Sequence, residues 1–308
     1  MSLSADDRAL FARGLRHAAE TLSGEALDTA LADLGWYDAL AVDRRTAVTL
    51  LFEVQGRSGA TSAALDAVLA TALGSDPGTA VVLPPLGSCA PPGAGGRVAG
   101  LATCALERAD LVLVGTDDGV VALHPEAVSA APIAGLDPGL GLVAVTGELT
   151  RGTALPGRWA DAVAAGQLAL AHELVGASRA MLDLARAHAL NRVQFDRPIA
   201  RFQAVRHRLA ESLVAIEAAA DATGAAWWDP SPLAVPSAKA IAGRSARAVA
   251  QHCQQVLAGI GFTLEHPFHH HLRRALVLDR LLGDARSVTR AMGDELLRSR
   301  RLPPMLPL

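Results

Sequence analysis

The sequence predicts a mainly α-helical protein with a small central β unit and a C-terminal bundle of long helices. Apolar residues recur at helical spacing before residue 79 and again after residue 155. Between them, short β-type runs are separated by Gly, Pro and Asp turns. At 308 residues and 51% hydrophobic content, the chain can bury a large core. We therefore expect a helical unit over 1–78, a reduced β unit over 79–150 and a helical bundle over 151–308.

The first two units differ in the period of their apolar residues. Leu10, Leu15 and Leu22 mark one amphipathic helix, and residues 48–52 mark another. From residue 79 the pattern changes to short runs rich in Val and Leu, as expected for strands. These runs are residues 81–83, 98–105, 111–114, 120–123 and 142–145.

Helical periodicity returns at Leu155 and continues nearly to the end. Helices are expected near residues 160–191, 202–228 and 232–259, with shorter ones reaching Arg300. Because several long helices follow one another with short connections, they should pack as an antiparallel bundle.

Charge and hydropathy exclude two classes of partner. The net charge is -3 and the basic residues are spread along the chain, so we expect no nucleic acid partner. The most apolar stretches are interrupted by Arg, Asp, Glu or Gly before they reach membrane-spanning length. The N-terminus, MSLSADD, is acidic where a signal peptide is basic. These patterns predict a cytoplasmic protein without a membrane segment.

The most informative segment is residues 192–211, which read RVQFDRPIARFQAVRHRLAE. Pro198 forbids a regular helix across residues 195–197, because proline removes a backbone donor and pushes the preceding residue toward extended conformations. One helix should therefore end near Arg192 and the next begin close to Pro198. The second helix should bury one face, formed by Phe202, Val205, Leu209, Leu213 and Ile216.

Three polar side chains are expected to converge at this corner, namely Arg192, Gln194 and Gln203. A permanent cation with two amides suits a diphosphate and its adjoining sugar, because a guanidinium donates in a rigid planar fork. Taken alone, the same residues also fit a capped joint between two helices with a surface ion pair.

Two segments resemble signatures of the acyl-CoA dehydrogenase family. Residues 192–211 resemble R-x-Q-F-G-x-P-I-x-x-F-Q-x-v-x-H-x-L-A, and residues 255–267, QVLAGIGFTLEHP, resemble Q-x-h-G-G-x-G-f-T-x-E-h-P. The resemblance is specific over about residues 155–285, and the order of the three units agrees with the family. It implies an acyl-CoA dehydrogenase-like fold with an N-terminal helical domain, a middle β domain and a C-terminal four-helix bundle.

The resemblance also implies an FAD cofactor between the β domain and the bundle, with its adenosine diphosphate end held by the neighbouring subunit. The positions that match the residues of that subunit are Arg192, Gln194, Phe195, Phe202, Gln203, Gln255, Ala258 and Gly259. Ala258 replaces the first glycine of the family's pair, and Leu257 replaces the preceding histidine. A methyl group at Ala258 is expected to crowd a close approach of the backbone.

The part of the family pattern that covers the flavin ring is missing from the central unit. We find neither the T-E-x-x-x-G-S-D type loop nor the W-x-T strand. Residues 87–96, GSCAPPGAGG, lie in the corresponding region but lack the Thr-Glu and Ser-Asp pairs. Their glycines do not form a G-x-x-x-x-G-K-[ST] phosphate loop, so we interpret the segment as a surface loop.

A catalytic base is also missing by position. In the family, a carboxylate removes the α proton of a CoA thioester while the β hydrogen leaves as hydride to the flavin. Counted from residues 273–275, which match the family's R-D-A, the glutamate of the usual Y-E-G-T falls on Leu282. The alternative position falls on Gly166, and neither residue can accept a proton. No catalytic residue is therefore identified.

Three carboxylates near these positions are expected to be structural. Glu173 and Asp284 lie nearest to the two vacant positions, and a helix-surface or capping role is favoured over that of a base. Glu265 belongs to the family's ordinary E-h-P and is treated as structural.

His266 and residues 269–271 suggest a metal site, but consecutive histidines on a helix point in different directions and no H-E-x-x-H is present. We predict no metal.

The resemblance favours one function and leaves two alternatives. The favoured one is a subunit of a heteromeric α2β2 acyl-CoA dehydrogenase, similar to those of bacterial steroid and cholesterol degradation. Its partner subunit would hold the catalytic glutamate, its substrate would be an acyl-CoA, and its electron acceptor an electron-transfer flavoprotein or similar protein. The alternatives are a self-sufficient homo-oligomeric dehydrogenase and a flavin-free structural or binding homologue.

Overall fold

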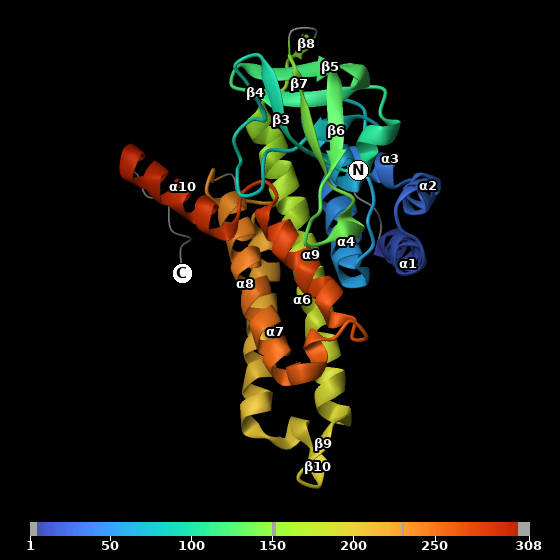
Figure 1. Cartoon of the computed structure of the whole chain (residues 1–308), viewed down its shortest axis with the longest axis vertical. Coiled ribbons are helices and arrows are strands. Elements are labelled where there is room, and N and C mark those ends of the chain that lie inside the picture. The colour runs from blue at the N-terminus through green and yellow to red at the C-terminus, as the bar shows by residue number, and fades with distance from the viewer. Residues whose placement is uncertain (1–4, 150–151, 230, 301–308) are drawn as a thin grey trace.

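The computed structural model describes residues 5–149, 152–229 and 231–300. Helices of the N-terminal unit lie beside the upper part of a long helical bundle, and a β-sheet covers the upper end of that bundle (Figure 1). The predicted fold class, mainly helical with a small central β domain, is confirmed.

The N-terminal unit is built around two fully buried aromatic residues, Trp36 and Phe52. Of the leucines that mark the first helix, Leu15 is fully buried, whereas Leu10 is 63% exposed. Asp43 caps the fourth helix by accepting a hydrogen bond from the Thr46 amide, as short polar residues do at helix starts. The helices are α1 (Ala5–Thr21), α2 (Glu25–Asp33), α3 (Trp36–Val42), α4 (Arg44–Ser58) and α5 (Ala64–Ala72).

The sheet has eight strands in the order β6-β7-β3-β2-β4-β5-β8, with β1 paired to β4 in parallel. Strand β6 was not predicted, because four of its five residues are exposed and it shows no apolar alternation. Strand β8 pairs with β5 and lies beyond residue 150. The strands are β1 (Ala80–Val82), β2 (Gly93–Ala94), β3 (Arg97–Ala102), β4 (Val112–Thr116), β5 (Gly119–Leu123), β6 (Val128–Pro132), β7 (Val143–Glu148) and β8 (Thr153–Leu155).

Among the described residues the C-terminal unit contains five helices, and α6 packs against α4, α7, α8 and α9. Helices α6, α7 and α8 run along the long axis of the molecule, while α10 points away from it (Figure 1). Within the described residues, no helix is long and apolar enough to cross a membrane. The helices are α6 (Trp159–Asn191), α7 (Gln203–Ala225), α8 (Ala234–Leu257), α9 (Phe268–Arg280) and α10 (Ala285–Ser299).

The buried face predicted for α7 is wrong at one position. Ile216 is 1% exposed, as expected, but Leu213 is 50% exposed. Ser212 takes its place in the buried face and satisfies its hydroxyl by donating to the Arg208 carbonyl at 2.8 Å. The face that packs in the bundle therefore includes a small polar residue that apolar periodicity does not detect.

Helices α4 and α6 meet backbone to backbone, and two glycines make this possible. A Cβ added to Gly56 would lie 2.0 Å from the Glu173 carbonyl oxygen, and one added to Gly176 would lie 2.1 Å from the Glu53 carbonyl oxygen. Both distances are far below van der Waals contact. Only glycine fits either position in this packing.

Gly176→Ala is expected to lower the free energy of unfolding by about 1–3 kcal/mol, because overpacking forces the two helices apart. A matched control is Gly293→Ala in α10, where an added Cβ meets nothing within 4 Å. That substitution should raise stability by up to about 1 kcal/mol through helix propensity. Urea unfolding measures both. A Gly176→Ala protein that unfolds at the wild-type urea concentration would contradict the close packing.

Candidate functional site

The corner after α6 is a tight hairpin. Helix α6 ends at Asn191, and β9 (Val193–Gln194) pairs antiparallel with β10 (Arg197–Pro198). The two residues of the turn, Phe195 and Asp196, adopt left-handed conformations with φ of 52° and 59°. A 3-10 turn, η4 (Ile199–Arg201), then leads into α7. The predicted helix end near Arg192 agrees with this geometry.

The residues expected at the adenosine end of FAD are mostly exposed at this corner. Phe195 is 85% exposed, and its ring packs edge-on against Phe202 with 6.1 Å between centroids. Gln194 is occupied locally, because its Nε2 donates to the Val193 carbonyl at 2.8 Å. Among the described residues, the side chains of Arg192 and Gln203 have no hydrogen-bond or ion-pair partner.

The second motif lies at the same end of the bundle. Burial, then the nearby charges of His266 and Arg192, lower the pKa of His188 on the last turn of α6. Both motifs are therefore within electrostatic reach of one side chain. Gln255, Ala258 and Gly259 are exposed around the turn η5 (Ala258–Phe262) that follows α8. The fold thus brings all eight predicted cofactor residues to one end of the molecule, where the β9–β10 hairpin is labelled in Figure 1.

Ala258 adopts a conformation that suits glycine. Its φ is 51° and its ψ is −133°, a combination that L-residues avoid because Cβ meets the backbone. The family has glycine at this position. The sequence already suggested that alanine suits this position less well than glycine. In the structure, Ala258 holds the backbone in a glycine-like conformation at a cost in free energy.

Ala258→Gly is expected to raise the free energy of unfolding by about 1 kcal/mol, because backbone strain of this kind costs about 1–3 kcal/mol and added chain entropy offsets part of the gain. Guanidinium unfolding would measure the change. Gly259→Ala is the matched comparison, since an added Cβ there meets nothing within 4 Å. A loss of stability in Ala258→Gly would show that the strain is absent.

The two positions expected for a catalytic base coincide in space. A Cβ added to Gly166 would lie 2.3 Å from Cδ1 of Leu282 and 2.8 Å from Cδ2 of Leu69. Leu282 and Leu69 are both fully buried. Positions that lie 116 residues apart in the sequence therefore face one another, and aliphatic side chains fill the space between them.

Buried donors fix the turn that carries Leu282. Its carbonyl accepts hydrogen bonds from Gln167 Nε2 at 2.9 Å and from Cys89 Sγ at 3.0 Å. Lys239, fully buried on α8, donates to the carbonyls of Asp279 at 2.8 Å and Gly283 at 3.1 Å. Leu282 itself has a left-handed φ of 53°. This turn is a well-satisfied part of the core and offers no proton acceptor.

The two carboxylates nearest in sequence have structural partners. Asp284 caps α10, because its Oδ1 accepts from the amides of Arg286 at 3.0 Å and Ser287 at 2.7 Å. Glu173 lies buried beside Arg274. Glu265 is exposed on the loop before α9.

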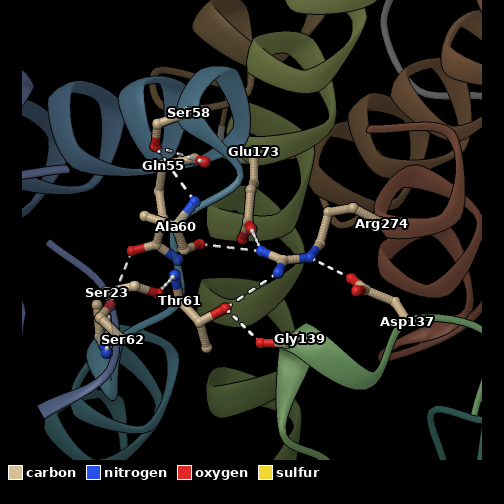
Figure 2. A network of polar contacts seen from close by, with 11 residues as sticks. Ser23, Gln55, Ser58, Ala60, Thr61, Ser62, Asp137, Gly139, Glu173 and Arg274 are labelled. Atoms are coloured by element: carbon tan, nitrogen blue, oxygen red, sulfur yellow. Dashed lines mark hydrogen bonds and ion pairs between the residues drawn. The ribbon is translucent and has the colours of Figure 1, made fainter. Parts of the chain in front are cut away.

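Arg274 is the centre of a buried polar network that sequence reasoning missed (Figure 2). Its guanidinium donates to Asp137, to the Ala60 carbonyl at 2.9 Å and to the Thr61 hydroxyl at 3.0 Å. A fourth contact, to Oε1 of Glu173, measures 3.6 Å. Arg274 stands where the family's R-D-A has an acid, so the charge is reversed at this position. The network joins the α4–α5 loop, the loop before β7, α6 and α9.

Glu173 is the least satisfied member of this network. Burial raises its pKa to about 7, although Arg274 and the side chain of Gln55 lower it. Its Oε1 is buried and has no hydrogen-bond partner among the described residues. Gln55 is itself oriented by Ser62, whose hydroxyl donates to Gln55 Oε1 at 2.7 Å. Desolvation therefore outweighs the neighbouring cation and raises the pKa of Glu173 to about 7.

A cavity of about 630 Å³ lies between the sheet and the bundle. Its walls are mainly apolar, with contributions from β3, β7 and α9, and two guanidinium groups, Arg247 and Arg280, also line it. Its volume is in the range of small-molecule sites, about 300–1,000 Å³. Like the FAD site that the resemblance implies, the cavity lies between the β unit and the bundle. None of the predicted cofactor residues lines it.

The rings of His269 and His270 lie 3.9 Å apart, whereas the other histidines around α9 make different contacts. His269 Nδ1 lies 2.8 Å from the His266 carbonyl oxygen, and Nδ1 of His271 is buried and has no hydrogen-bond partner among the residues described. Over residues 5–149, 152–229 and 231–300, no group of three or more His, Cys, Asp or Glu side chains is arranged to hold a metal ion.

Sequence comparison assigns the C-terminal part of the chain. Residues 160–296 match the family model described as the acyl-CoA dehydrogenase C-terminal domain. The acyl-CoA dehydrogenase IpdE2 of Mycobacterium tuberculosis is 34% identical over 171 residues, which cover 56% of this chain and 53% of IpdE2. FadE34 of the same organism, also an acyl-CoA dehydrogenase, is 46% identical over 121 residues, or 37% of this chain and 17% of FadE34. The matched region thus spans about half of IpdE2 and a smaller part of FadE34.

Structural comparison extends the likeness to nearly the whole chain. The ChsE4-ChsE5 complex of Mycobacterium tuberculosis gives a TM-score of 0.78 at 22% identity, covering 99% of this chain and 100% of the compared chain. The Tcur3481-Tcur3483 steroid ACAD gives 0.75 at 22%, covering 96% of each chain. A glutaryl-CoA dehydrogenase of Mycobacterium smegmatis with FADH2 gives 0.77 at 15%, covering 98% and 97%. Residues 160–296 are thus an acyl-CoA dehydrogenase C-terminal domain, and the chain as a whole has the fold of the acyl-CoA dehydrogenases.

Proposed function

We propose that this chain is a subunit of an FAD-dependent acyl-CoA dehydrogenase that supplies cofactor contacts, while a partner subunit supplies the catalytic base. One observation carries the proposal. Both positions expected for the base, Gly166 and Leu282, meet in a packed apolar core, whereas Arg192 and Gln203 have no hydrogen-bond or ion-pair partner in the part of the chain that the structure describes. The chain has thus lost a proton acceptor and kept donors that suit the adenosine end of FAD.

The residues at the corner fit the group assigned to them. When bound, FAD accepts the β hydride of the acyl-CoA. The guanidinium of Arg192 offers a planar fork of donors to a diphosphate, and Gln203 and Gln255 offer amides to the adjoining ribose. The exposed ring of Phe195 and the half-buried ring of Phe202 supply apolar surface for adenine. The resemblance implies that the flavin held here belongs to a neighbouring subunit, and the exposure of this end of the bundle in the single chain agrees with that.

The partner and the substrate are proposed from the same comparisons. ChsE4-ChsE5 is a complex of two proteins, and the Tcur3481-Tcur3483 pair is described as a steroid ACAD. We therefore propose an α2β2 heteromer in the cytoplasm, a steroid-derived acyl-CoA as substrate, and an electron-transfer flavoprotein or similar protein as electron acceptor. Activity should require both subunits.

The decisive experiment compares flavin content and assembly mass in two preparations. One contains this chain alone, and the other contains the chain co-expressed with a partner acyl-CoA dehydrogenase subunit from the same genome. The proposal expects colourless protein from the first and a yellow, active heteromer from the second. Stoichiometric FAD together with acyl-CoA oxidation by the chain alone would overturn it and favour the self-sufficient alternative.

Arg192→Ala is expected to weaken FAD binding by the heteromer about 10- to 100-fold, because hydrogen bonds to charged groups contribute about 1.5–3 kcal/mol. Arg201→Ala is the matched control, since Arg201 is exposed on the adjacent turn and has no partner among the described residues. FAD retained after gel filtration at increasing dilution measures the effect. Equal retention in the two variants would remove Arg192 from the cofactor site.

A further inference from the structure

We propose that Arg197 is a second phosphate-binding arginine and that it forms, with Arg192, a two-armed clamp for the diphosphate of FAD. This inference rests on the proposed function and adds a residue to it. Neither the corner residues expected from the sequence nor the family pattern, which leaves this position unspecified, assigns Arg197 a role. The geometry of the β9–β10 hairpin points to it.

The hairpin register places the two arginines on one face. Arg197 pairs directly with Gln194 across the two strands. Side chains of directly opposed residues point to the same face, and so do those of residues two apart on one strand. Arg192, two residues before Gln194, therefore shares a face with Arg197. The pairing continues to that point, since the Ile199 amide donates to the Arg192 carbonyl at 2.8 Å.

The spacing suits a diphosphate. Diagonal neighbours on one face of an antiparallel pair lie about 7–8 Å apart. Two arginine side chains rooted at that distance can converge on adjacent phosphate groups, each through its planar fork of donors. Like charges on one face of a two-stranded ribbon repel each other when nothing lies between them. A bound dianion removes that repulsion.

Arg197 is already positioned by an aromatic ring. Its guanidinium carbon lies 4.5 Å from the centroid of Phe202, and Phe202 is in turn contacted edge-on by Phe195. Stacking on a ring uses the face of the guanidinium and leaves the N–H groups at its edge free to donate. No hydrogen bond or ion pair to Arg197 occurs among the described residues. The donors are therefore oriented and available.

The turn between the strands has the backbone that a two-residue hairpin requires. Phe195 and Asp196 both have positive φ, although neither is glycine, and Phe195 is 85% exposed. The family has glycine in place of Asp196. A two-residue hairpin turn requires positive φ at both central residues, so the hairpin itself holds Phe195 in this conformation and sets its ring against Phe202.

The negative charge of Asp196 repels an anion. Removing this charge should therefore change diphosphate binding in the opposite direction to removing an arginine. Its carboxylate stands at the tip of the hairpin beside Arg197 and has no ion-pair partner among the described residues. Asp196→Asn should therefore tighten diphosphate binding, whereas removal of either arginine should weaken it.

The test uses the full chain alone, with FAD as probe and flavin fluorescence anisotropy as readout at low ionic strength. Arg197→Ala is expected to weaken binding about tenfold, similar to Arg192→Ala. Arg197→Lys should recover part of the loss, because it restores the charge without the fork. Arg201→Ala should bind as the parent chain does. The dependence of the dissociation constant on salt should be shallower in both arginine-to-alanine variants.

The outcomes separate this inference from the proposed function. If Arg192→Ala weakens binding and Arg197→Ala does not, the second arm of the clamp is overturned while the corner keeps its role. If the parent chain alone does not bind FAD, the clamp is not preformed on this subunit and the inference is overturned. The proposed function would still be supported in that case if the co-expressed heteromer is yellow. Equal losses in Arg197→Ala and Arg201→Ala would show a general effect of charge and overturn the clamp.

Discussion

Arg274→Met is expected to lower the free energy of unfolding by about 3–5 kcal/mol, the usual result of removing one partner from a buried ion pair. Arg274 is 4% exposed and is the only cation that contacts both Asp137 and Glu173 among the described residues. Methionine keeps the length of the side chain and removes all of its donors. The Ala60 carbonyl and the Thr61 hydroxyl then lose their partner as well.

Guanidinium unfolding followed by circular dichroism measures this change, and Arg57→Ala provides the control. Arg57 forms an ion pair with Asp183 in which both side chains are more than half exposed, so its loss should cost at most about 1 kcal/mol. If the two substitutions cost the same, the Arg274 network contributes no more than a surface ion pair.

The network also connects stability to the shape of the interdomain cavity. Asp137 belongs to the Arg274 network and at the same time lines the cavity between the sheet and the bundle. Gly139, from the same loop, accepts a hydrogen bond from the Thr61 hydroxyl at 2.9 Å (Figure 2). Arg274 thus holds the loop around Asp137, which forms one wall of the cavity. Removing the contacts of Arg274 should leave this loop less firmly held.

The sequence predicted those elements whose ends are determined by a few neighbouring residues. Pro198 forbids helix on steric grounds, so the end of α6 and the start of α7 follow from a few residues. The sheet was less predictable at its edges. Strand β6 is mostly exposed, and without one buried face its residues carry no alternating pattern.

The buried polar groups could not be predicted in the same way. The partners of Arg274 come from the α4–α5 loop, the loop before β7 and α6, which only the tertiary fold brings together. Counting along the sequence identified Gly166 and Leu282 as two separate vacancies. In the structure the two positions face one another. The side chain of Leu282 occupies the space beside Gly166 that a side chain at position 166 would otherwise fill.

Glu173→Gln is expected to make the protein more stable than wild type at pH 8, by up to about 3 kcal/mol, with the difference shrinking to less than about 1 kcal/mol at pH 5. The folded-state pKa of Glu173 is raised to about 7 from an ordinary value of 4.5, chiefly by burial. The folded state therefore binds a proton more tightly than the unfolded state does. The stability that this proton confers is fully present below pH 4.5 and is lost as the pH rises through 7.

Glutamine imitates the protonated carboxyl and cannot ionise, so it removes this loss. Each pH unit between the two pKa values corresponds to about 1.4 kcal/mol, which sets the upper limit of the effect. The measurement is the free energy of unfolding from urea titrations at several pH values between 5 and 8, for both proteins under the same salt. All other titrating groups are common to the two proteins, so they cancel in the difference between the curves. A variant less stable than wild type at pH 8 would show that Glu173 is ionised in the folded state and that its attraction to Arg274 exceeds the cost of burial.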